Sequence, residues 1–424
     1  MKADWINCNF EDILTLKNGF AFKSDKYSEN GTPVIRISDI NDAIVKTTNA
    51  KKVQDEENYE NYLIEFGDIL IAMSGATTGK FGIYKEQNKA YQNQRVGNFK
   101  LHCEKLINKN YIYYLLYALR RQIEKDAYGG AQPNISSKKI EAMQITLAPL
   151  LEQKAIVAKI EQLFSELDNA IANLKTAKAK LKIYRQAVLK KAFEGIAQIN
   201  FEQIIQSSQN GLSKRSGKEG EFYKVLRLAD IKDFQIVENE PRSIQMNENE
   251  IEKYKLEIND LICTRVNGSK DLVGTFTLYH NDTNWAFCDH FIRLKLNENS
   301  ISKFYFYFLK TREVRKYIHD NMVSSAGQNT VSQTTIKAIQ VPTCSIEEQN
   351  QIVQEIESRL SVCDKIEETI ENSLAKSEAL RQSILKKAFE GKLLSEQELE
   401  NIKNHPDFES AEELLKRIKK ERNK

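Results

Sequence analysis

The heptapeptide LKKAFEG occurs twice in this chain of 424 residues, at Leu189–Gly195 and again at Leu385–Gly391. The copies are 196 residues apart, and this offset holds upstream without a gap as far as GGAQPNIS at Gly129–Ser136 and SAGQNTVS at Ser325–Ser332. Self-similarity at a fixed offset over such a length is the mark of a duplicated unit. The sequence therefore predicts an internal repeat that accounts for nearly the whole chain.

The repeat continues further upstream, where it is weaker and the offset drifts. PVIRISDI at Pro33–Ile40 is similar to KVLRLADI at Lys224–Ile231, and GDILIAMSG is similar to NDLICTRVNG. The drift indicates small insertions and deletions, which are tolerated best in surface loops. Each unit is thus a variable globular region followed by a constant segment.

The constant segment has the pattern of a long helix. From Glu152 to Phe193, apolar residues recur at alternating steps of four and three, which is the heptad pattern of a coiled coil. The second copy is less regular, because Arg359, Ser373 and Ser377 fall on its stripe. The residues predicted to pair the helices are Ile156, Ile160, Leu163, Leu167, Leu174 and Leu181 in the first, and Ile352, Ile356, Ile366, Ile370, Leu380 and Ile384 in the second.

A helix of about forty residues is roughly 60 Å long and has to bury its apolar stripe. Its nearest partner is the other copy in the same chain, which favours an antiparallel intramolecular coiled coil with a pseudo-twofold internal repeat. Pairing between chains is the alternative interpretation of such a stripe. The presence of both copies in one polypeptide favours the intramolecular pairing.

The globular regions combine short β-rich runs, bounded by Gly, Asn and Ser, with helical runs near residues 110–125 and 302–320. The fold class is therefore α+β. We expect a first globular domain at 1–148, a first helix at 149–195, a second globular domain at 196–341, a second helix at 342–394, and a charged segment at 395–424 that either docks or frays.

Composition restricts the function only weakly. The 62 Lys and Arg against 59 Asp and Glu leave a net charge of +3, so an acidic partner has to be met by local patches. The N-terminus lacks the apolar core of a signal peptide, and no stretch is apolar enough to span a membrane. The six cysteines lack C-x-x-C spacing and are typical of reduced thiols. We expect a cytoplasmic protein without a membrane partner.

Motifs for catalysis are missing from the sequence. SGATTGK at Ser74–Lys80 has only three residues between its glycines, and Phe81 stands where a phosphate-binding loop needs Ser or Thr. No two prolines are adjacent, which excludes the Asn/Asp-Pro-Pro-aromatic tetrapeptide of amino-methyltransferases. The run Cys288–His290 favours a structural role over a metal site. We therefore expect neither catalytic residues nor a metal site on this chain.

Polar and basic loops at matching places in both halves are the candidate binding site. Arg and Lys can bond guanine, Asn and Gln can bond adenine, and hydroxyl groups suit phosphates. Each loop alone could be a plain exposed turn, but recurrence in both halves favours binding. The predicted DNA-binding residues are Arg36, Ser74, Thr77, Thr78, Lys80, Arg95, Gln132 and Asn134 in the first half, and Arg227, Arg265, Asn267, Ser269, Lys270, Gln328 and Asn329 in the second.

This organisation resembles the specificity subunit of Type I restriction-modification enzymes. The resemblance rests on PLLEQKAIVAKIEQLFSELD at Pro149–Asp168 and YRQAVLKKAFEG at Tyr184–Gly195. Their second copies are CSIEEQNQIVQEIESRLSVCD at Cys344–Asp364 and LRQSILKKAFEG at Leu380–Gly391. The similarity extends over essentially the whole chain and is most specific in the two helices.

The resemblance implies a non-catalytic DNA-binding subunit. Each globular region would be a target recognition domain that reads one half of a split, asymmetric site in double-stranded DNA. The paired helices would set the distance between the half-sites and dock two methyltransferase subunits, with two restriction-translocase subunits in complexes that also cleave. No cofactor is expected on this chain, since S-adenosylmethionine, ATP and Mg²⁺ would be held by the partner subunits.

Two other functional classes make different predictions. A coiled-coil scaffold that binds proteins through its globular ends would show no sequence-dependent retention of DNA. A stand-alone enzyme with unrecognised chemistry would turn over S-adenosylmethionine or ATP without partners, whereas a specificity subunit would not.

Overall fold

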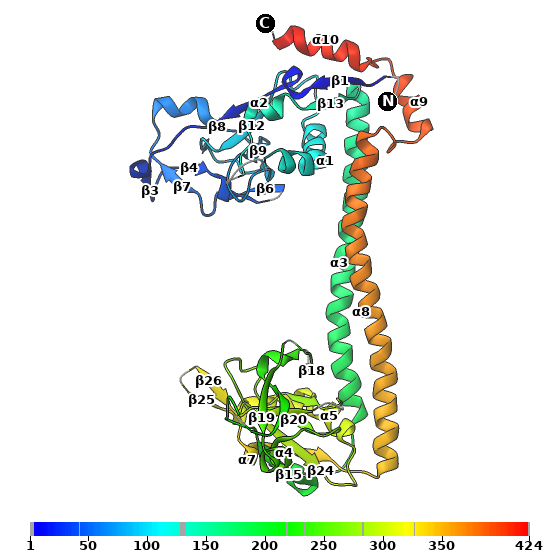
Figure 1. Cartoon of the computed structure of the whole chain (residues 1–424). Helices are drawn as coiled ribbons and strands as arrows, with labels where there is room; N and C mark the ends of the chain where they lie inside the picture. Colours follow the sequence, from blue (N-terminus) through cyan, green and yellow to red (C-terminus); the bar gives the residue numbers. More distant parts are fainter. Residues whose placement is uncertain are drawn as a thin grey trace. The chain divides into compact units, whose positions relative to one another are not determined.

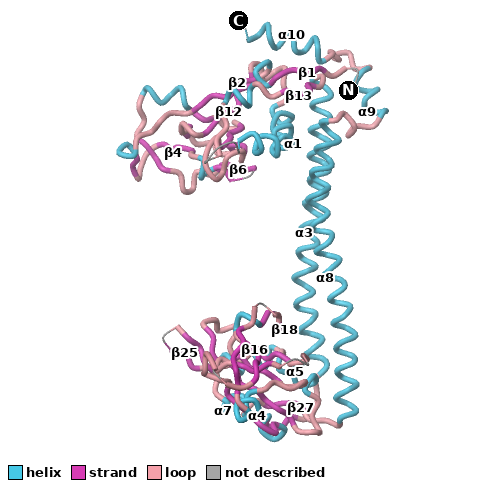
Figure 2. The backbone as a smooth tube through the Cα atoms, in the orientation of Figure 1, coloured by secondary structure: helices cyan, strands magenta, loops and turns pink. Residues whose placement is uncertain are grey.

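A computed structural model describes residues 4–41, 43–127, 133–217, 219–232, 234–238, 240–281, 284–325 and 327–422 (Figures 1 and 2). The chain forms two compact units. Unit 1 consists of Met1–Ala172 with Leu374–Lys424, and unit 2 consists of Asn173–Ser373. Each unit holds one globular domain and about half of each long helix, α3 (Leu150–Ala192) and α8 (Ile346–Phe389).

The globular domain of unit 1 is built on two mixed sheets. The larger has the order β2 (Leu14–Asn18), β12 (Val96–Leu101), β9 (Ile69–Ala72), β10 (Phe81–Tyr84), β6 (Ala43–Val45) and β5 (Ile40–Asn41). The smaller has the order β3 (Tyr27–Ser28), β7 (Lys51–Val53), β4 (Thr32–Ile35), β11 (Ala90–Gln92) and β8 (Leu63–Ile64). Strand β9 has the sequence ILIA and is buried throughout, because Ile69 and Ile71 pack into one buried cluster and Leu70 and Ala72 into another.

Helices and a short strand pair complete this domain. Helix α1 (Lys109–Ala127) and helix α2 (Ser137–Glu141) contribute to its core, and β1 (Ile6–Asn9) pairs with β13 (Gln144–Leu147) directly before α3 begins. The N-terminal strand is thus tied to the segment that leads into the long helix.

The globular domain of unit 2 repeats this plan. Its central sheet has the order β15 (Ile205–Asn210), β24 (Phe291–Leu296), β20 (Leu261–Thr264) and β22 (Phe276–Leu278). A second sheet has the order β19 (Arg242–Met246), β16 (Glu221–Leu226) and β23 (Trp285–Phe287). Smaller sheets join β21 (Val266–Asn267), β26 (Gln328–Thr330) and β25 (Val323–Ser325), β17 (Ile231–Lys232) with β18 (Gln235–Ile236), and β14 (Gln198–Asn200) with β27 (Gln340–Pro342). Its helices are α4 (Glu248–Tyr254), α5 (Ser302–Leu309), α6 (Arg312–Asn321) and α7 (Gln333–Lys337).

Matching strands pair in the same way in both domains. In unit 1, β9 pairs antiparallel with β12 and β10, and β4 pairs parallel with β11. In unit 2, β20 pairs antiparallel with β24 and β22, and β16 pairs parallel with β23. The predicted α+β class and internal repeat are confirmed. One difference is that the α1 segment is a single helix, whereas its copy is divided into α5 and α6.

In unit 1, the first half of α3 packs against the last half of α8. Ile156 and Ile160 belong to the same buried cluster as Ile384 and Ala388. Further along α3, Asp168 forms an ion pair with Arg381, whose guanidinium also lies 4.9 Å from the ring centre of Phe164. Later residues of α3 therefore contact earlier residues of α8, and the predicted antiparallel pairing is confirmed in this unit.

In unit 2, the second half of α3 pairs with the first half of α8. Lys178 Nζ lies 2.6 Å from Glu371, and Arg185 lies 2.7 Å from Asp364. Seven residues forward on α3 therefore correspond to seven residues back on α8, which is again antiparallel. The pair Arg185–Asp364 is the repeat copy of the pair Arg381–Asp168, so the duplication preserves the pairing contacts as well as the sequence.

Two of the predicted pairing residues are wrong. Ile366 is 44% exposed and Leu380 is 50% exposed, because the half-buried Glu367 and Arg381, one position further along α8, face α3 in their place. These long side chains reach across to Arg185 and Asp168, and their charges replace the apolar contact. The other predicted pairing residues are buried or half-buried: Ile156, Ile160, Leu163, Leu167, Leu174, Leu181, Ile352, Ile356, Ile370 and Ile384.

The repeated glycine lies shortly after the end of each long helix, Gly195 three residues after Ala192 and Gly391 two residues after Phe389. Gly195 and Gly391 have φ of +80° and +73°, a backbone conformation that costs a residue with a Cβ but not glycine. Each glycine therefore allows the chain to turn away from its helix, and at Gly391 the amides of Gly391 and Lys392 donate back to the last turn of α8.

The C-terminal segment docks on unit 1. Helix α9 (Glu396–Lys403) leads into α10 (Ala411–Arg422), whose Leu414 and Ile418 are fully buried in the cluster that also contains Trp5. An ion pair of 2.8 Å joins Lys419 to Asp12. The sequence left docking and fraying open, and the described part of this segment is docked.

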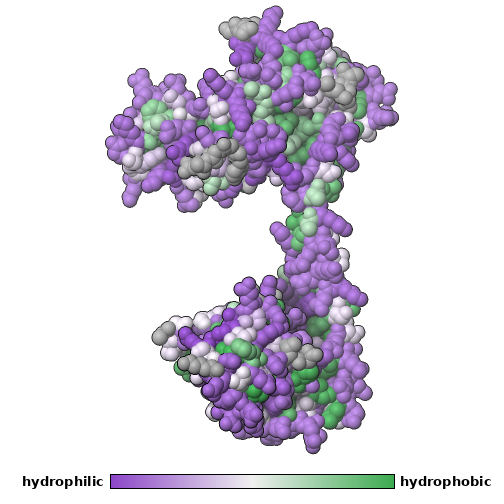
Figure 3. Space-filling view, viewed as in Figure 1, coloured by the Kyte–Doolittle hydropathy of each residue, from purple (hydrophilic) through white to green (hydrophobic). Residues whose placement is uncertain are grey.

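The surfaces of both units are mainly hydrophilic on the face that Figure 3 shows. Within the described part of the chain, no helix is both long and apolar enough to cross a membrane.

Candidate nucleic-acid interface

The predicted loops of unit 1 meet at one place. Ser74, in the loop between β9 and β10, forms an isolated bridge with Asn134, and the Gly75 amide donates to the Pro133 carbonyl over 3.0 Å. These loops and the segment before β12 enclose a cleft of about 620 Å³. Ser74, Arg95 and Asn134 line it together. Its polar wall also includes residues that were not predicted: Asn18, Gln94, Ser136 and Ser137.

Other predicted residues of unit 1 stabilise the loop. The buried Thr78 hydroxyl donates to the Gly75 carbonyl over 2.6 Å, and the Thr77 hydroxyl donates to the Ile37 carbonyl over 3.3 Å. Arg36 is held against the buried Asp39 with a nitrogen-to-oxygen distance of 3.3 Å, and Lys80 is half-buried. Gln132 lies outside the described residues. The loop therefore contains both cleft-lining residues and residues that fix its shape.

In unit 2, the matching loop is closed by a hairpin. Asn329 is 5% exposed, and its amide nitrogen donates to the carbonyl groups of Asn267 and Gly268 over 3.3 and 2.9 Å. Its oxygen accepts from the Ser324 hydroxyl over 2.6 Å, so the whole amide is used within the hairpin. The Asn267 side chain accepts from the Ser269 amide, whereas Lys270, Gln328 and the Ser269 side chain are exposed.

Unit 2 has a polar pocket beside the β23–β24 turn. Arg215, Arg227, Arg242 and His290 line this pocket of about 350 Å³ together with Asp289. Arg227 was predicted and is held by Asp230 through two contacts of 2.8 and 2.9 Å. Arg265 donates to the Asp289 carbonyl over 3.4 Å. Arg215, Arg242, Asp289 and His290 were not predicted, because these positions come together only through the fold.

The electrostatics of this pocket favour an anion. The ligand atoms of Cys288, Asp289 and His290 lie within 4.8 Å of one another, which is close enough for a metal ion. However, the same pocket is lined by three arginines, whose charges oppose a bound cation and attract a phosphate or the acceptor edge of a base.

A family model described as the Type I restriction modification DNA specificity domain matches residues 2–178 and again residues 199–376. The chain belongs to the specificity subunits of Type I restriction-modification systems. It is 34% identical to the Type I restriction enzyme StySPI specificity subunit of Salmonella potsdam, over 99% of this chain and 95% of that protein. It is 28% identical to the EcoKI specificity subunit of Escherichia coli strain K12, with the same shares covered.

Solved structures agree on the fold. A chain from a structure of complex assembly and conformational transition of the type I R-M system matches with a TM-score of 0.71 at 16% identity, over 93% of this chain and 99% of that chain. The HsdS subunit from Thermoanaerobacter tengcongensis matches with a TM-score of 0.62 at 14% identity, over 93% and 98%. The fold of this specificity subunit is therefore shared with known members of the family.

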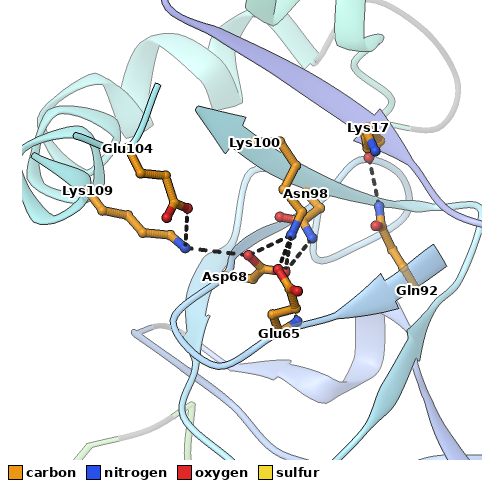
Figure 4. Close-up of polar contacts among 8 residues, drawn as sticks. All are labelled: Lys17, Glu65, Asp68, Gln92, Asn98, Lys100, Glu104 and Lys109. Atoms are coloured by element: carbon orange, nitrogen blue, oxygen red, sulfur yellow. Dashed lines mark hydrogen bonds and ion pairs between the residues drawn. The ribbon is translucent and has the colours of Figure 1, made fainter. Parts of the chain in front are cut away.

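A buried aspartate precedes the central strand in each domain of the specificity subunit. Asp68 accepts hydrogen bonds of 2.8 to 2.9 Å from the Glu65 amide, Asn98 and Lys100, which converge on it in Figure 4. Lys109 lies 3.5 Å away on the other side. Burial alone would raise the pKa of Asp68, but these hydrogen bonds and the Lys100 charge outweigh burial and lower it.

The copy of this residue, Asp260, has a different environment. It keeps the amide hydrogen bond, from Glu257 over 2.8 Å, but Lys295, the copy of Lys100, pairs with the Glu257 side chain instead. Burial raises the pKa of Asp260 to about 6, and the Glu257 amide and the charge of Arg293 offset this effect only in part. At this position of the repeat, the ionised carboxylate is thus stabilised in unit 1 and destabilised by burial in unit 2.

Matched substitutions at these two aspartates should have opposite effects. We expect Asp68→Asn to cost unit 1 about 2 kcal/mol near pH 7, because charged hydrogen bonds to Lys100 are lost. We expect Asp260→Asn to stabilise unit 2 by up to about 3 kcal/mol, because the cost of ionising a buried carboxyl disappears. Hydrogen-exchange protection of peptides from β9 and β20 measures each unit separately.

The effect of each substitution on stability should change with pH. The folded pKa of Asp260 lies above its unfolded value, so the advantage of Asp260→Asn is full above about pH 6 and vanishes below about pH 4. The folded pKa of Asp68 is lowered, so the deficit of Asp68→Asn persists above about pH 4 and shrinks as the pH falls further. Equal effects of the two substitutions at pH 7.5 would contradict this account.

Proposed function

We propose that this specificity subunit recognises a bipartite, asymmetric site in double-stranded DNA, with one half-site for each globular domain. The observation that carries the proposal is a shared framework with different polar linings. Where Ser74, Arg95 and Asn134 line a cleft in unit 1, the matching loop of unit 2 is closed by the β25–β26 hairpin, and arginines line a separate pocket beside the β23–β24 turn. Because different side chains prefer different base edges, the two half-sites should differ.

The long helices serve in this proposal as spacer and docking surface for two methyltransferase subunits. Tyr184 in α3 and Leu380 in α8 occupy the same position of the repeat, and both are about half exposed. Exposed apolar side chains at repeated positions suit two copies of one partner, since each copy would meet a similar surface. In complexes that restrict DNA, two restriction-translocase subunits would join the assembly.

Catalysis belongs to the partner subunits in this proposal. The methyltransferase subunits would hold S-adenosylmethionine and methylate adenine, and the restriction subunits would use ATP and Mg²⁺ in the cytoplasm. The chain itself would bind and position the DNA and take no chemical step. The alternative of a protein-binding scaffold predicts that DNA is not retained in a sequence-dependent way.

Co-expression of the chain with a methyltransferase subunit from its own host tests the proposal. Mapping N6-methyladenine across the genome of a host that lacks other adenine methylation should give one split motif with two different halves. A control without this chain should show no such motif. Methylation without any motif, or a motif that is independent of this chain, would overturn the proposal.

A further inference from the structure

Two short turns occupy the same place in the two domains. The turn Asn93–Arg95 connects β11 with β12, and the turn Cys288–His290 connects β23 with β24. In the first, the amides of Asn93, Gln94 and Val96 donate to the carbonyls of Ile35, Phe20 and Asn93 over 3.0, 2.8 and 2.9 Å. In the second, the amides of Cys288, Asp289 and Phe291 donate to the carbonyls of Leu226, Leu212 and Cys288 over 3.2, 3.1 and 3.0 Å. The main chain of the turn is therefore held in the same way in both copies.

Further contacts fix the turns to the loops of the candidate interface. The Arg95 carbonyl accepts from the Met73 amide over 2.9 Å, and the His290 carbonyl accepts from the Arg265 amide over 2.7 Å. Glycine is required beside each turn. A Cβ on Gly19 would lie 2.2 Å from the Gln92 carbonyl oxygen, and one on Gly211 would lie 2.0 Å from the Cys288 carbonyl oxygen. The backbone of each turn is thus held mainly by main-chain contacts, and in the first turn the Asn93 side chain also accepts from the Arg95 amide over 3.3 Å.

The side chains of the turns differ completely between the copies. Gln94 and Arg95 of the first turn are exposed and line the cleft of unit 1 with Ser74 and Asn134. At the corresponding positions, Asp289 and His290 line the arginine pocket of unit 2, and their carboxylate and ring nitrogen lie 3.2 Å apart. The positions therefore combine a fixed backbone with variable hydrogen-bonding groups in the two polar recesses.

We propose that these turns are base-reading elements that determine the preferred base at one position of each half-site. In unit 1, Arg95 would donate to the O6 and N7 acceptors of guanine, with Gln94 suited to a neighbouring adenine. In unit 2, the Asp289 carboxylate would accept from the amino group of cytosine, and His290 would orient that carboxylate. This inference rests on the proposed function, since it names the residues that distinguish the two half-sites.

The test uses the full-length chain in its complex with the methyltransferase subunits and maps adenine methylation across a genome. In Arg95→Ala we expect the preference for guanine at one position of one half-site to fall by about tenfold, with the other half-site unchanged. In Asp289→Asn we expect a changed preference at one position of the other half-site only. The exchange variants Q94D/R95H and D289Q/H290R should move the base preference without changing the gap between the half-sites.

Exposed arginines on helices of the same units provide matched controls. Arg121→Ala and Arg312→Ala should leave the motif unchanged. A motif unchanged in both Arg95→Ala and Asp289→Asn would overturn the inference. A uniform loss of methylation at all sites, in variants that melt like the wild type, would also overturn it, because it would indicate a phosphate contact. Failure of the proposed function is distinguishable, since the wild-type complex would then give no split motif at all.

Discussion

Removing one heptad from each long helix should shorten the gap between the two half-sites by about three base pairs and leave both half-sites unchanged. The deletion takes out Ala170–Thr176 of α3 and Ser373–Ala379 of α8. These segments lie between the ion pair Asp168–Arg381 and the ion pair Lys178–Glu371, so both pairs are kept. Seven residues of helix correspond to about 10 Å, and a base pair to about 3.4 Å.

The measurement is the methylation motif of the shortened chain in complex with its methyltransferase subunits. Deletion of a heptad from α3 alone is the matched control. It should abolish the complex, because every pairing contact on one side of the deletion moves out of register. An unchanged gap in a folded and active double-deletion complex would show that the helices do not set the distance between half-sites.

Replacing the buried glutamine at the start of either long helix should destabilise the adjoining domain by about 3 kcal/mol. Gln153 accepts from the Asn108 amide over 3.0 Å and donates to the Ala148 carbonyl over 2.8 Å. Its copy Gln349 accepts from the Ile301 amide over 2.8 Å and donates to the Cys344 carbonyl over 3.0 Å. Leucine would remove the partner of a half-buried amide and of at least one carbonyl in each case, at about 1–3 kcal/mol for each group.

Hydrogen exchange measures these effects one unit at a time. Gln153→Leu should lower protection in α1, and Gln349→Leu should lower protection in α5. Gln162→Leu is the matched control in the same helix, because its amide pairs only at the surface with Glu166 over 3.0 Å, and it should change stability by less than about 0.5 kcal/mol. If Gln153→Leu and Gln349→Leu lost as little protection as Gln162→Leu, the two glutamines would not stabilise the contact between each long helix and its domain.

The sequence predicted the repeat and both long helices because they depend on local patterns. The duplicated motif, the heptad spacing and the terminal glycine each point to the same element. The error at Ile366 and Leu380 has a physical reason. A stripe predicted from apolar residues leaves out charged residues. Glu367 and Arg381 nevertheless face the other helix, because each pairs there with an opposite charge.

The candidate interface was only partly predictable for a different reason. Ser74, Arg95 and Asn134 lie in loops with polar sequence, and the structure brings them to one cleft. Asn329 lies in an equally polar loop, yet its amide is used entirely inside the hairpin. Arg215 and Arg242 reach the pocket of unit 2 from segments far apart in the sequence. The one available signal was the alignment of QNQR with FCDH, in which matching positions differ in chemistry.

The central claim is that each globular domain reads one half-site independently, and a chain with the first domain in both places tests it most directly. The junctions follow equivalent contacts, since the Phe10 amide bonds the Met143 carbonyl over 3.2 Å and the Phe201 amide bonds the Ile339 carbonyl over 2.9 Å. Residues 201–338 are therefore replaced by a second copy of residues 10–142. The account predicts a methylation motif whose two halves are inverted copies of the first half-site, with the gap unchanged. A folded, active complex that still methylates the original asymmetric motif would contradict it.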